Sequence, residues 1–209
     1  YEIPKRDWSS DVCSSDLQNR NFRECFCLQR GFAHHGVDAD VWGLLHDNYH
    51  ETPDWESYDL IFIIENWDWI PDLSNIKTKK YLWAIDTHCK GADVYNQFAR
   101  THNLDEVFYA SGIINGWWLP NCYDDTIIKP LNKPKVYDIG FCGNVANRGE
   151  LINIMKANFP GFKFDNFVIG NAMVEAVNSY KIHWNANISY DINYRNFETD
   201  WKSTRLNSS

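Results

Sequence analysis

The sequence predicts an α/β protein whose parallel strands fall into two βαβ lobes. Strand-like apolar runs alternate with segments of helical period, the order that produces parallel sheets. Residues 58–64 (YDLIFII) are almost continuously apolar, as expected of a strand buried on both faces. A break follows at residues 124–136, where two prolines and three lysines interrupt the pattern before it restarts. This segment is interpreted as an interdomain linker.

The composition excludes several classes of protein. The chain has 209 residues, 44% hydrophobic and 23% charged, which is typical of a globular protein. Its formal net charge of −8 gives no electrostatic basis for binding nucleic acid or an anionic membrane surface. No run of 18 apolar residues exists, so no transmembrane segment is expected. Six unevenly spaced cysteines favour buried free thiols, and a cytoplasmic location is predicted.

Both ends of the sequence resemble translated sequencing adapter. Residues 7–17 (DWSSDVCSSDL) and residues 202–209 (KSTRLNSS) back-translate to the two arms of one adapter oligonucleotide. We therefore expect residues 1–17 and 202–209 to be foreign, which leaves 184 native residues and an unchanged net charge of −8. The first strand of the first lobe and part of the second lobe are then expected to be missing.

The first lobe, residues 18–123, is predicted from seven segments. A helix over residues 22–35 precedes Gly36, a candidate C-cap, and the other elements follow in order. These are strands at 39–44, 58–64 and 80–85, a helix at 92–102, a strand at 106–110, and the closing segment 117–120.

The second lobe, residues 137–201, repeats the alternation. The predicted elements are a strand at 137–141, a turn at 142–144, a helix at 148–158, an extended segment within 162–169, a helix at 172–180, a strand at 181–184 and a helix opening within 191–198. The lobe is incomplete if the adapter interpretation holds.

Polar residues follow the predicted strands. In open α/β sheets, ligands bind beyond the carboxyl ends of strands, where Glu65, Asp86 and His88 are expected. The alternative for His88 is a structural loop histidine. Gly143 follows another strand and precedes a helix, a pattern typical of an anion site to which Arg148 adds a charge. The alternative there is an ordinary βα turn.

Residues 185–198 (NANISYDINYRNFE) concentrate polar groups in one short segment. Arg195 can clamp a diphosphate bidentately, and Glu198 can accept two hydrogen bonds from a ribose diol. The alternative interpretation makes Asp191 a helix N-cap, and Arg195 with Glu198 an i,i+3 surface pair.

Residues 137–160 and 178–198 resemble the second lobe of CgeB-type glycosyltransferases, and WWLPNCYDD at 117–125 resembles the end of their first lobe. The resemblance implies two Rossmann-like lobes of the GT-B type. It further implies that Glu198 binds the nucleotide ribose, that Arg195 and Asn193 face the diphosphate or donor sugar, and that Gly143, Asn144 and Arg148 line the nucleotide side. The chain departs from the family after Thr199, where a glycine-rich loop is expected.

The implied activity is metal-independent transfer of a sugar from a nucleotide-sugar donor to an acceptor hydroxyl on a glycan, protein or lipid-linked substrate. Arg195 and Arg148 would stabilise the leaving phosphate, with no cofactor. Asp86 or His88 would orient or deprotonate the acceptor. As this fragment, the enzyme is expected to be poorly active. The alternatives are a nucleotide-sugar epimerase on the same fold and a non-catalytic glycan-binding or structural relative.

Other candidate motifs are weaker. Asp38 and Asp40 spell Asp-x-Asp but precede a predicted strand. Cys25 and Cys27 lie two apart on a helix, so their side chains diverge and zinc is disfavoured. Four tryptophans stand where sugars can stack, although core packing explains most such residues; they are Trp67, Trp69, Trp117 and Trp118.

Overall fold

The computed structural model describes residues 20–65, 69–110, 116–145, 148–187 and 194–200. Within these ranges the protein is α/β, and every described strand pair is parallel. The chain divides into two compact units: the first reaches Tyr109 and includes residues 116–118, and the second includes Ala110 and continues from Leu119. Both predicted adapter segments and the opening of the last predicted helix lie outside the described residues.

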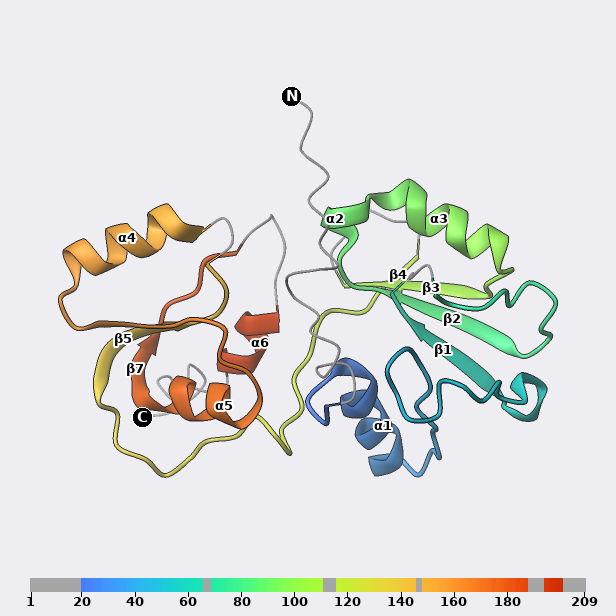
Figure 1. Ribbon diagram of the computed structural model, residues 1–209, viewed down its shortest axis with the longest axis horizontal. Coiled ribbons are helices and arrows are strands. Elements are labelled where there is room, and N and C mark those ends of the chain that lie inside the picture. Colours follow the sequence, from blue (N-terminus) through green and yellow to red (C-terminus); the bar gives the residue numbers. More distant parts are fainter. Residues whose placement is uncertain (1–19, 66–68, 111–115, 146–147, 188–193, 201–209) are drawn as a thin grey trace. The chain divides into compact units, whose positions relative to one another are not determined.

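The first unit is a four-stranded sheet in the order β1-β2-β3-β4. Helices α2 (Thr87–Lys90) and α3 (Ala92–Thr101) cover one face, and α1 (Glu24–His34) lies on the other (Figure 1). A crossover through α2 and α3 joins β2 to β3, which keeps these strands parallel. The strands are β1 (Leu60–Ile64), β2 (Lys79–Ala84), β3 (Glu106–Tyr109) and β4 (Trp117–Trp118).

The core of the first unit joins this sheet to α3. Leu82 and Tyr95 are fully buried, and Phe98 packs against the same cluster. Leu73 also belongs to it, although its segment after β1 forms no regular element. On the opposite face, the Phe32 ring of α1 meets the Phe62 ring of β1 edge-on at 6.2 Å. The two faces of the sheet are therefore buried by different elements, as the apolar run of β1 predicts.

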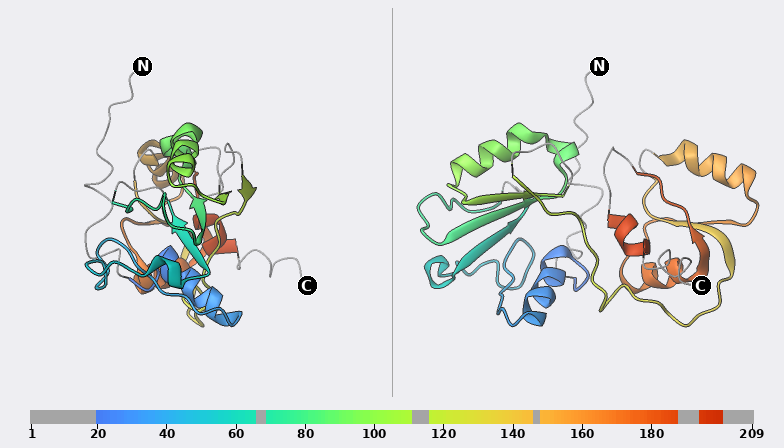
Figure 2. Two further views of the ribbon diagram at one scale, coloured as in Figure 1. Left: turned by 90° about the vertical axis from the view of Figure 1, so that its right-hand side faces the viewer. Right: turned by 180° about the vertical axis from the view of Figure 1, so that it is seen from behind.

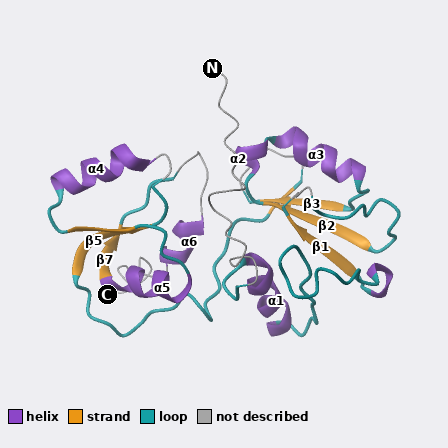
Figure 3. Ribbon diagram, in the orientation of Figure 1, coloured by secondary structure: helices purple, strands orange, loops and turns teal. Residues whose placement is uncertain are grey.

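The second unit is a three-stranded sheet in the order β6-β5-β7, formed by β5 (Tyr137–Cys142), β6 (Phe162–Asp165) and β7 (Tyr180–His183). Helix α4 (Gly149–Asn158) lies on one face and α5 (Gly170–Ser179) on the other, as Figure 3 shows by element type. The chain leaves β5 through α4 to β6 and returns through α5 to β7. The strand order therefore reverses between β5 and β7, and a last helix, α6 (Tyr194–Asp200), follows β7.

The segment interpreted as a linker is attached to the second unit. Asn178 of α5 is buried; its Oδ1 accepts from the Leu131 N–H at 2.9 Å, and its Nδ2 donates to the Lys129 carbonyl at 3.1 Å. Leu131, Ile127 and Ile128 pack against the α5 core. The prolines and lysines that suggest a free connection therefore belong to a segment with fixed partners.

Most predicted elements are confirmed within one or two residues, and the C-cap is confirmed because Gly36 has a φ of 75°. The strand predicted at 39–44 is wrong. Side chains satisfy its backbone: Gln29 Nε2 donates to the Ala39 carbonyl at 2.6 Å, and Asn48 Nδ2 donates to the Val41 carbonyl at 2.9 Å. The loop therefore obtains its hydrogen bonds without a neighbouring strand. A short 3₁₀ helix, η1 (Trp55–Ser57), was not predicted.

Candidate functional site

The carboxyl edge of the second sheet contains most of the predicted donor-site residues. Loops leave β5 and β7 at the point where the strand order reverses, and the right-hand view of Figure 2 shows the strands of this sheet between α4 and α5. Ligands in open α/β sheets bind at such a point.

Two glycines of β5 and its turn are required by packing. A Cβ at Gly140 would overlap the ring of Tyr180, and a Cβ at Gly143 would stand 2.9 Å from Cζ of Phe141. The Gly143 N–H is also engaged, since it donates to the Asp165 carbonyl at 3.0 Å. Neither glycine has a positive φ. The sequence signal at 140–144 is therefore explained by close side-chain packing, and the Gly143 amide is held by β6.

Arg148 joins the two loops at this edge. Its Nε donates to the Ala186 carbonyl in the loop after β7 at 2.6 Å, and its Nη1 donates to the Asn144 carbonyl at 3.2 Å. The guanidinium lies 5.6 Å from the centre of the Phe141 ring. Burial lowers the pKa of Arg148, and the nearby Arg195 lowers it further. Arg148 thus fixes the geometry of the edge and brings a second cation close to Arg195.

Three asparagines connect the loop after β7 to α6. Asn185 Nδ2 donates to Asn196 Oδ1 at 2.8 Å, and Asn196 Nδ2 donates to Asn187 Oδ1 at 3.1 Å. The Trp184 ring meets the Phe141 ring at 5.3 Å and anchors the start of this loop. The polar composition of residues 185–198 therefore has a structural use in holding α6.

Arg195 and Glu198 form an ion pair on α6. The Nη1 of Arg195 lies 2.8 Å from Oε2 of Glu198, and the side chains are only 19% and 16% exposed. Arg195 Nη1 also contacts the sulfur of Met173 on α5. The i,i+3 pairing was anticipated as an alternative, but the pair is partly buried against α5 and is not a surface pair.

Asp165 and Tyr180 add a carboxylate and a phenol that the sequence analysis missed. The Tyr180 hydroxyl donates to Asp165 Oδ2, and Lys163 Nζ lies 3.2 Å from Asp165 Oδ1. Burial, followed by this hydrogen bond, raises the pKa of Tyr180. Burial likewise raises the pKa of Cys142 to about 11, so this thiol is neutral at pH 7. The sequence signal for this arrangement was Gly140, because a glycine within a buried strand often marks the close approach of another group, here the Tyr180 ring.

In the first unit, Glu65 directly follows β1, where an acceptor-binding residue was expected, but its side chain is buried and bonded to neighbouring elements. Its Oε1 accepts from the N–H groups of Ile85 and Asp86, the latter at 2.8 Å, and its Oε2 accepts from the Tyr95 hydroxyl at 2.6 Å. Lys90 Nζ lies 3.5 Å from Oε2. Glu65 is buried and has a φ of 63°. Its carboxylate therefore holds the turn that carries Asp86 at the end of β2.

The remaining predicted residues are placed as follows. Asp86 is exposed at the N-cap of α2; the side chain of His88 and all of Asn193 lie outside the described residues. Asp40 accepts from the Tyr58 hydroxyl at 2.9 Å. Trp117 and Trp118 are each 63% exposed, whereas Trp67 lies outside the described residues. Among the residues that the structure describes, no three His, Cys, Asp or Glu side chains gather as metal ligands do.

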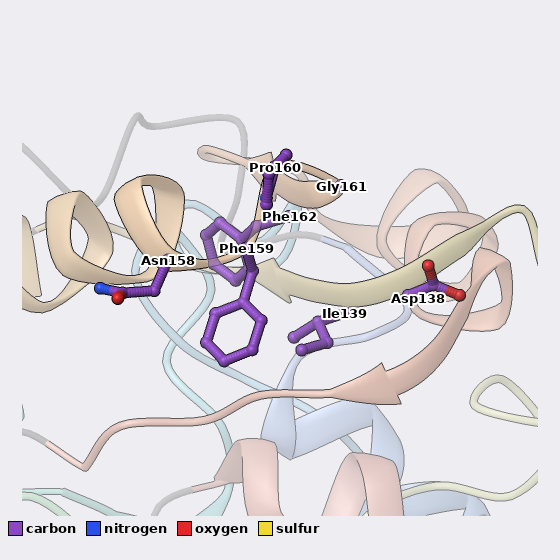
Figure 4. A pocket seen from close by; sticks show the side chains of 7 residues that line it. All are labelled: Asp138, Ile139, Asn158, Phe159, Pro160, Gly161 and Phe162. Atoms are coloured by element: carbon purple, nitrogen blue, oxygen red, sulfur yellow. The ribbon is translucent and has the colours of Figure 1, made fainter.

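A shallow cavity in the second unit lies away from this edge. It has a volume of about 160 Å³ and is lined by residues 138–139 of β5 and 158–162 at the α4–β6 turn. Figure 4 shows Phe159 and Ile139 facing each other, with Asp138 and Asn158 pointing outward. Ligand pockets usually hold about 300–1,000 Å³. This cavity, at the amino ends of the strands, is too small for a nucleotide sugar. A second hollow, of about 460 Å³, lies in the first unit along residues 44–50.

No family model, no curated protein and no solved structure matches this chain. Within the described residues, no helix has the length and apolarity needed to cross a membrane. The described residues form an α/β protein with two parallel sheets and a cluster of charged side chains at the carboxyl edge of the second sheet.

Proposed function

We propose that the second unit binds the nucleoside diphosphate part of a nucleotide sugar and that the protein is a glycosyltransferase of the two-lobed GT-B type. The observation that carries the proposal is the pairing of Arg195 with Glu198 beside Arg148, at the edge where the strand order reverses. Arg195 is near enough to contribute to the lowered pKa of Arg148, and two guanidinium groups at one edge favour an anionic ligand there. The sequence resemblance to CgeB-type enzymes supports the same assignment.

The chemistry follows from charge development during transfer. Cleavage of the bond between the anomeric carbon and the diphosphate leaves negative charge on the phosphate and positive charge on the sugar. Arg195 would take the leaving phosphate, and Arg148, held by the Ala186 and Asn144 carbonyls, would keep the two loops around it in place. Asp86, which the Glu65 network positions, would assist the acceptor hydroxyl together with His88.

Calorimetric titration of the 209-residue chain with UDP, GDP and ADP tests the binding step. We expect one nucleotide to bind, and Arg195→Gln to weaken its binding at least tenfold, since a charged contact contributes about 1.5–3 kcal/mol. Arg100→Gln is the matched control and should leave binding unchanged, since Arg100 is an exposed arginine of α3 whose Nη2 donates to Gln97 Oε1 at 3.1 Å. Absence of binding to all three nucleotides would refute the proposal.

The competing functions are separated by products. Transfer of a labelled sugar to a glycan, without change to the free nucleotide sugar, is the outcome expected of a glycosyltransferase. Interconversion of the nucleotide sugar in the absence of acceptor would identify an epimerase instead. Glycan binding without nucleotide binding would identify a non-catalytic relative.

A further inference from the structure

Residues 70–77 lie just before β2, at the amino edge of the first sheet, and form no helix or strand. Leu73 in this segment is only 2% exposed and belongs to the core of the first unit. The Leu73 N–H donates to Nδ1 of His102, the C-cap residue of α3, at 3.2 Å. Asn103 Nδ2 donates to the Ser74 carbonyl at 3.0 Å. Side chains at the end of α3 therefore supply hydrogen bonds that hold the segment over the core.

The Leu73 contact fixes the protonation state of His102. A backbone N–H only donates, so Nδ1 is an unprotonated acceptor and the neutral ring carries its proton on Nε2. The side chain is 12% exposed, and the centre of its ring lies 4.3 Å from that of the Phe98 ring of α3. A proton added at Nδ1 turns this acceptor into a donor. The N–H of buried Leu73 would then face another N–H, which is unfavourable in a partly desolvated position.

Charged groups act on the His102 ring from the segment and from β2. Asp72 Oδ1 lies 3.9 Å from Nδ1, and together with the carbonyl end of α3 it favours a protonated ring. Lys80 of β2 opposes a protonated ring, and its buried ammonium donates to the Ile76 carbonyl of the same segment. Burial is the largest effect, so the pKa of His102 is lowered from its ordinary value of 6.5.

The direction of this shift gives the sign of the pH dependence. The ring binds a proton less readily while the segment is in place than it does when exposed to water. The contact therefore stabilises the closed segment fully above pH 6.5, and this stabilisation is lost as the pH falls below that value.

We propose that His102 is a pH-sensitive switch whose neutral ring holds residues 70–77 over the core and whose protonation releases them. On protonation, Nδ1–H turns toward Asp72, and the Leu73 N–H loses its acceptor. Release of the segment lets water hydrate that N–H, withdraws the Leu73 side chain from the core and exposes the apolar residues beneath it. The inference is independent of the proposed nucleotide site, which lies in the second unit.

Hydrogen exchange of the whole chain at pH 7.5 and pH 5.5 tests the switch, with rates converted to protection factors to remove the intrinsic pH dependence. Carboxylates of ordinary pKa, about 4, stay ionised over this range. We expect the protection factor of the Leu73 amide to fall about threefold or more, since each pH unit below 6.5 gives at most about a tenfold effect. Amides of β2 should keep their protection, because the opening is local.

Four variants separate the ring from its surroundings. His102→Asn places an amide oxygen near the position of Nδ1 and does not titrate, so Leu73 should be equally protected at both pH values. His102→Ala removes the acceptor and should lower the protection at both. Asp72→Asn removes the charge that favours the protonated ring, so the loss should move to lower pH. His35→Asn replaces the exposed C-cap histidine of α1 and, as the matched control, should leave the response unchanged.

Three results would overturn the inference. The first is equal protection of the Leu73 amide at pH 7.5 and pH 5.5 in the unmodified chain. The second is the same pH-dependent loss in His102→Asn. The third comes from nuclear magnetic resonance of the unmodified chain with ¹⁵N-labelled histidine: a proton on Nδ1 at pH 7.5, or a His102 titration midpoint above 6.5. This last measurement needs no variant, so it decides the question even if the His102 substitutions prevent folding.

Discussion

Each of the two units places a largely buried carboxylate at the carboxyl edge of a parallel sheet, but the partners differ. In the first unit, Glu65 is held by two backbone N–H groups, a tyrosine hydroxyl and a lysine, drawn from the β2–α2 turn, α2 and α3. In the second unit, Glu198 pairs with Arg195 on the same short helix. The same residue type at the same kind of edge therefore joins several elements in one unit, whereas in the other it forms an ion pair with a residue of its own helix.

The physical reason is the origin of the partners. The Glu65 carboxylate has partners in several elements, and all of these hydrogen bonds break if it moves away. Glu65 therefore cannot be displaced without opening the turn that carries Asp86. The Arg195–Glu198 ion pair, by contrast, joins two residues of α6. We therefore expect substitutions at Glu65 to affect stability first and, under the proposed function, substitutions at Glu198 to affect nucleotide binding first.

The largest expected effect is at Glu65. Glu65→Gln replaces an acceptor-only carboxylate by an amide that cannot accept from all of its partners, and it leaves Lys90 without its buried counter-charge. We expect the first unit to lose about 4 kcal/mol of unfolding free energy. Urea titration followed by circular dichroism measures it. Asp93→Asn, an exposed carboxylate on α3, is the control and should stay within about 0.5 kcal/mol. Equal effects of the two variants would break the comparison.

The next effect is steric and falls in the second unit. Gly140→Ala would drive a methyl group into the Tyr180 ring and displace its hydroxyl from Asp165. We expect a loss of about 3 kcal/mol in urea titrations. Gly149→Ala places its methyl 3.6 Å from Val145 at the start of α4, where it should be neutral or stabilise by about 0.5 kcal/mol. A Gly140→Ala variant as stable as the parent would show that Tyr180 is free to move.

A pH-dependent effect is expected from Cys142 in the second unit. The pKa of Cys142 is raised from its ordinary value of 9.0 to about 11 in the folded protein, so the unfolded chain releases the thiol proton first as pH rises. Unfolding free energy should therefore fall between pH 9 and pH 11, by about 1–3 kcal/mol, and be unaffected by this group below pH 8.

Unfolding free energies measured at pH 8, 9, 10 and 11 test this expectation. Cys142→Ala should flatten the decline, although Tyr180, whose pKa is also raised, leaves part of it. Cys142→Ala also removes packing against α5, which lowers the unfolding free energy at every pH. The two proteins are therefore compared by the slope of unfolding free energy against pH. An identical slope in the variant would contradict the assignment.

The smallest effect should come from the exposed pair between Lys133 and Glu175. Lys133→Gln removes one charge from the segment after Asp124 but leaves the Asn178 contacts to that segment intact. The expected change is below about 0.5 kcal/mol by urea titration. Asn178→Ala, which removes the buried amide, should cost about 2 kcal/mol in the same assay. A reversal of this order would mean that the charge, and not the amide, fixes the segment.

The hydrophobic period of the sequence alone determined the α/β class, nearly all described helices and strands, and the i,i+3 relation of Arg195 to Glu198. These follow from local rules, because a buried parallel strand requires a continuous apolar run and a helix sets its own side-chain spacing. The absence of a strand at 39–44 could not be predicted in this way, since side chains ten and seven residues away donate hydrogen bonds to two of its carbonyls.

Only the tertiary structure decided which polar residues are committed to the fold. It joined Glu65 to Tyr95, laid Tyr180 across Gly140, and turned Arg148 onto the loop after β7. Each of these contacts links residues between about 30 and 40 positions apart. Such pairings depend on how the sheets and helices pack, and no local pattern encodes them.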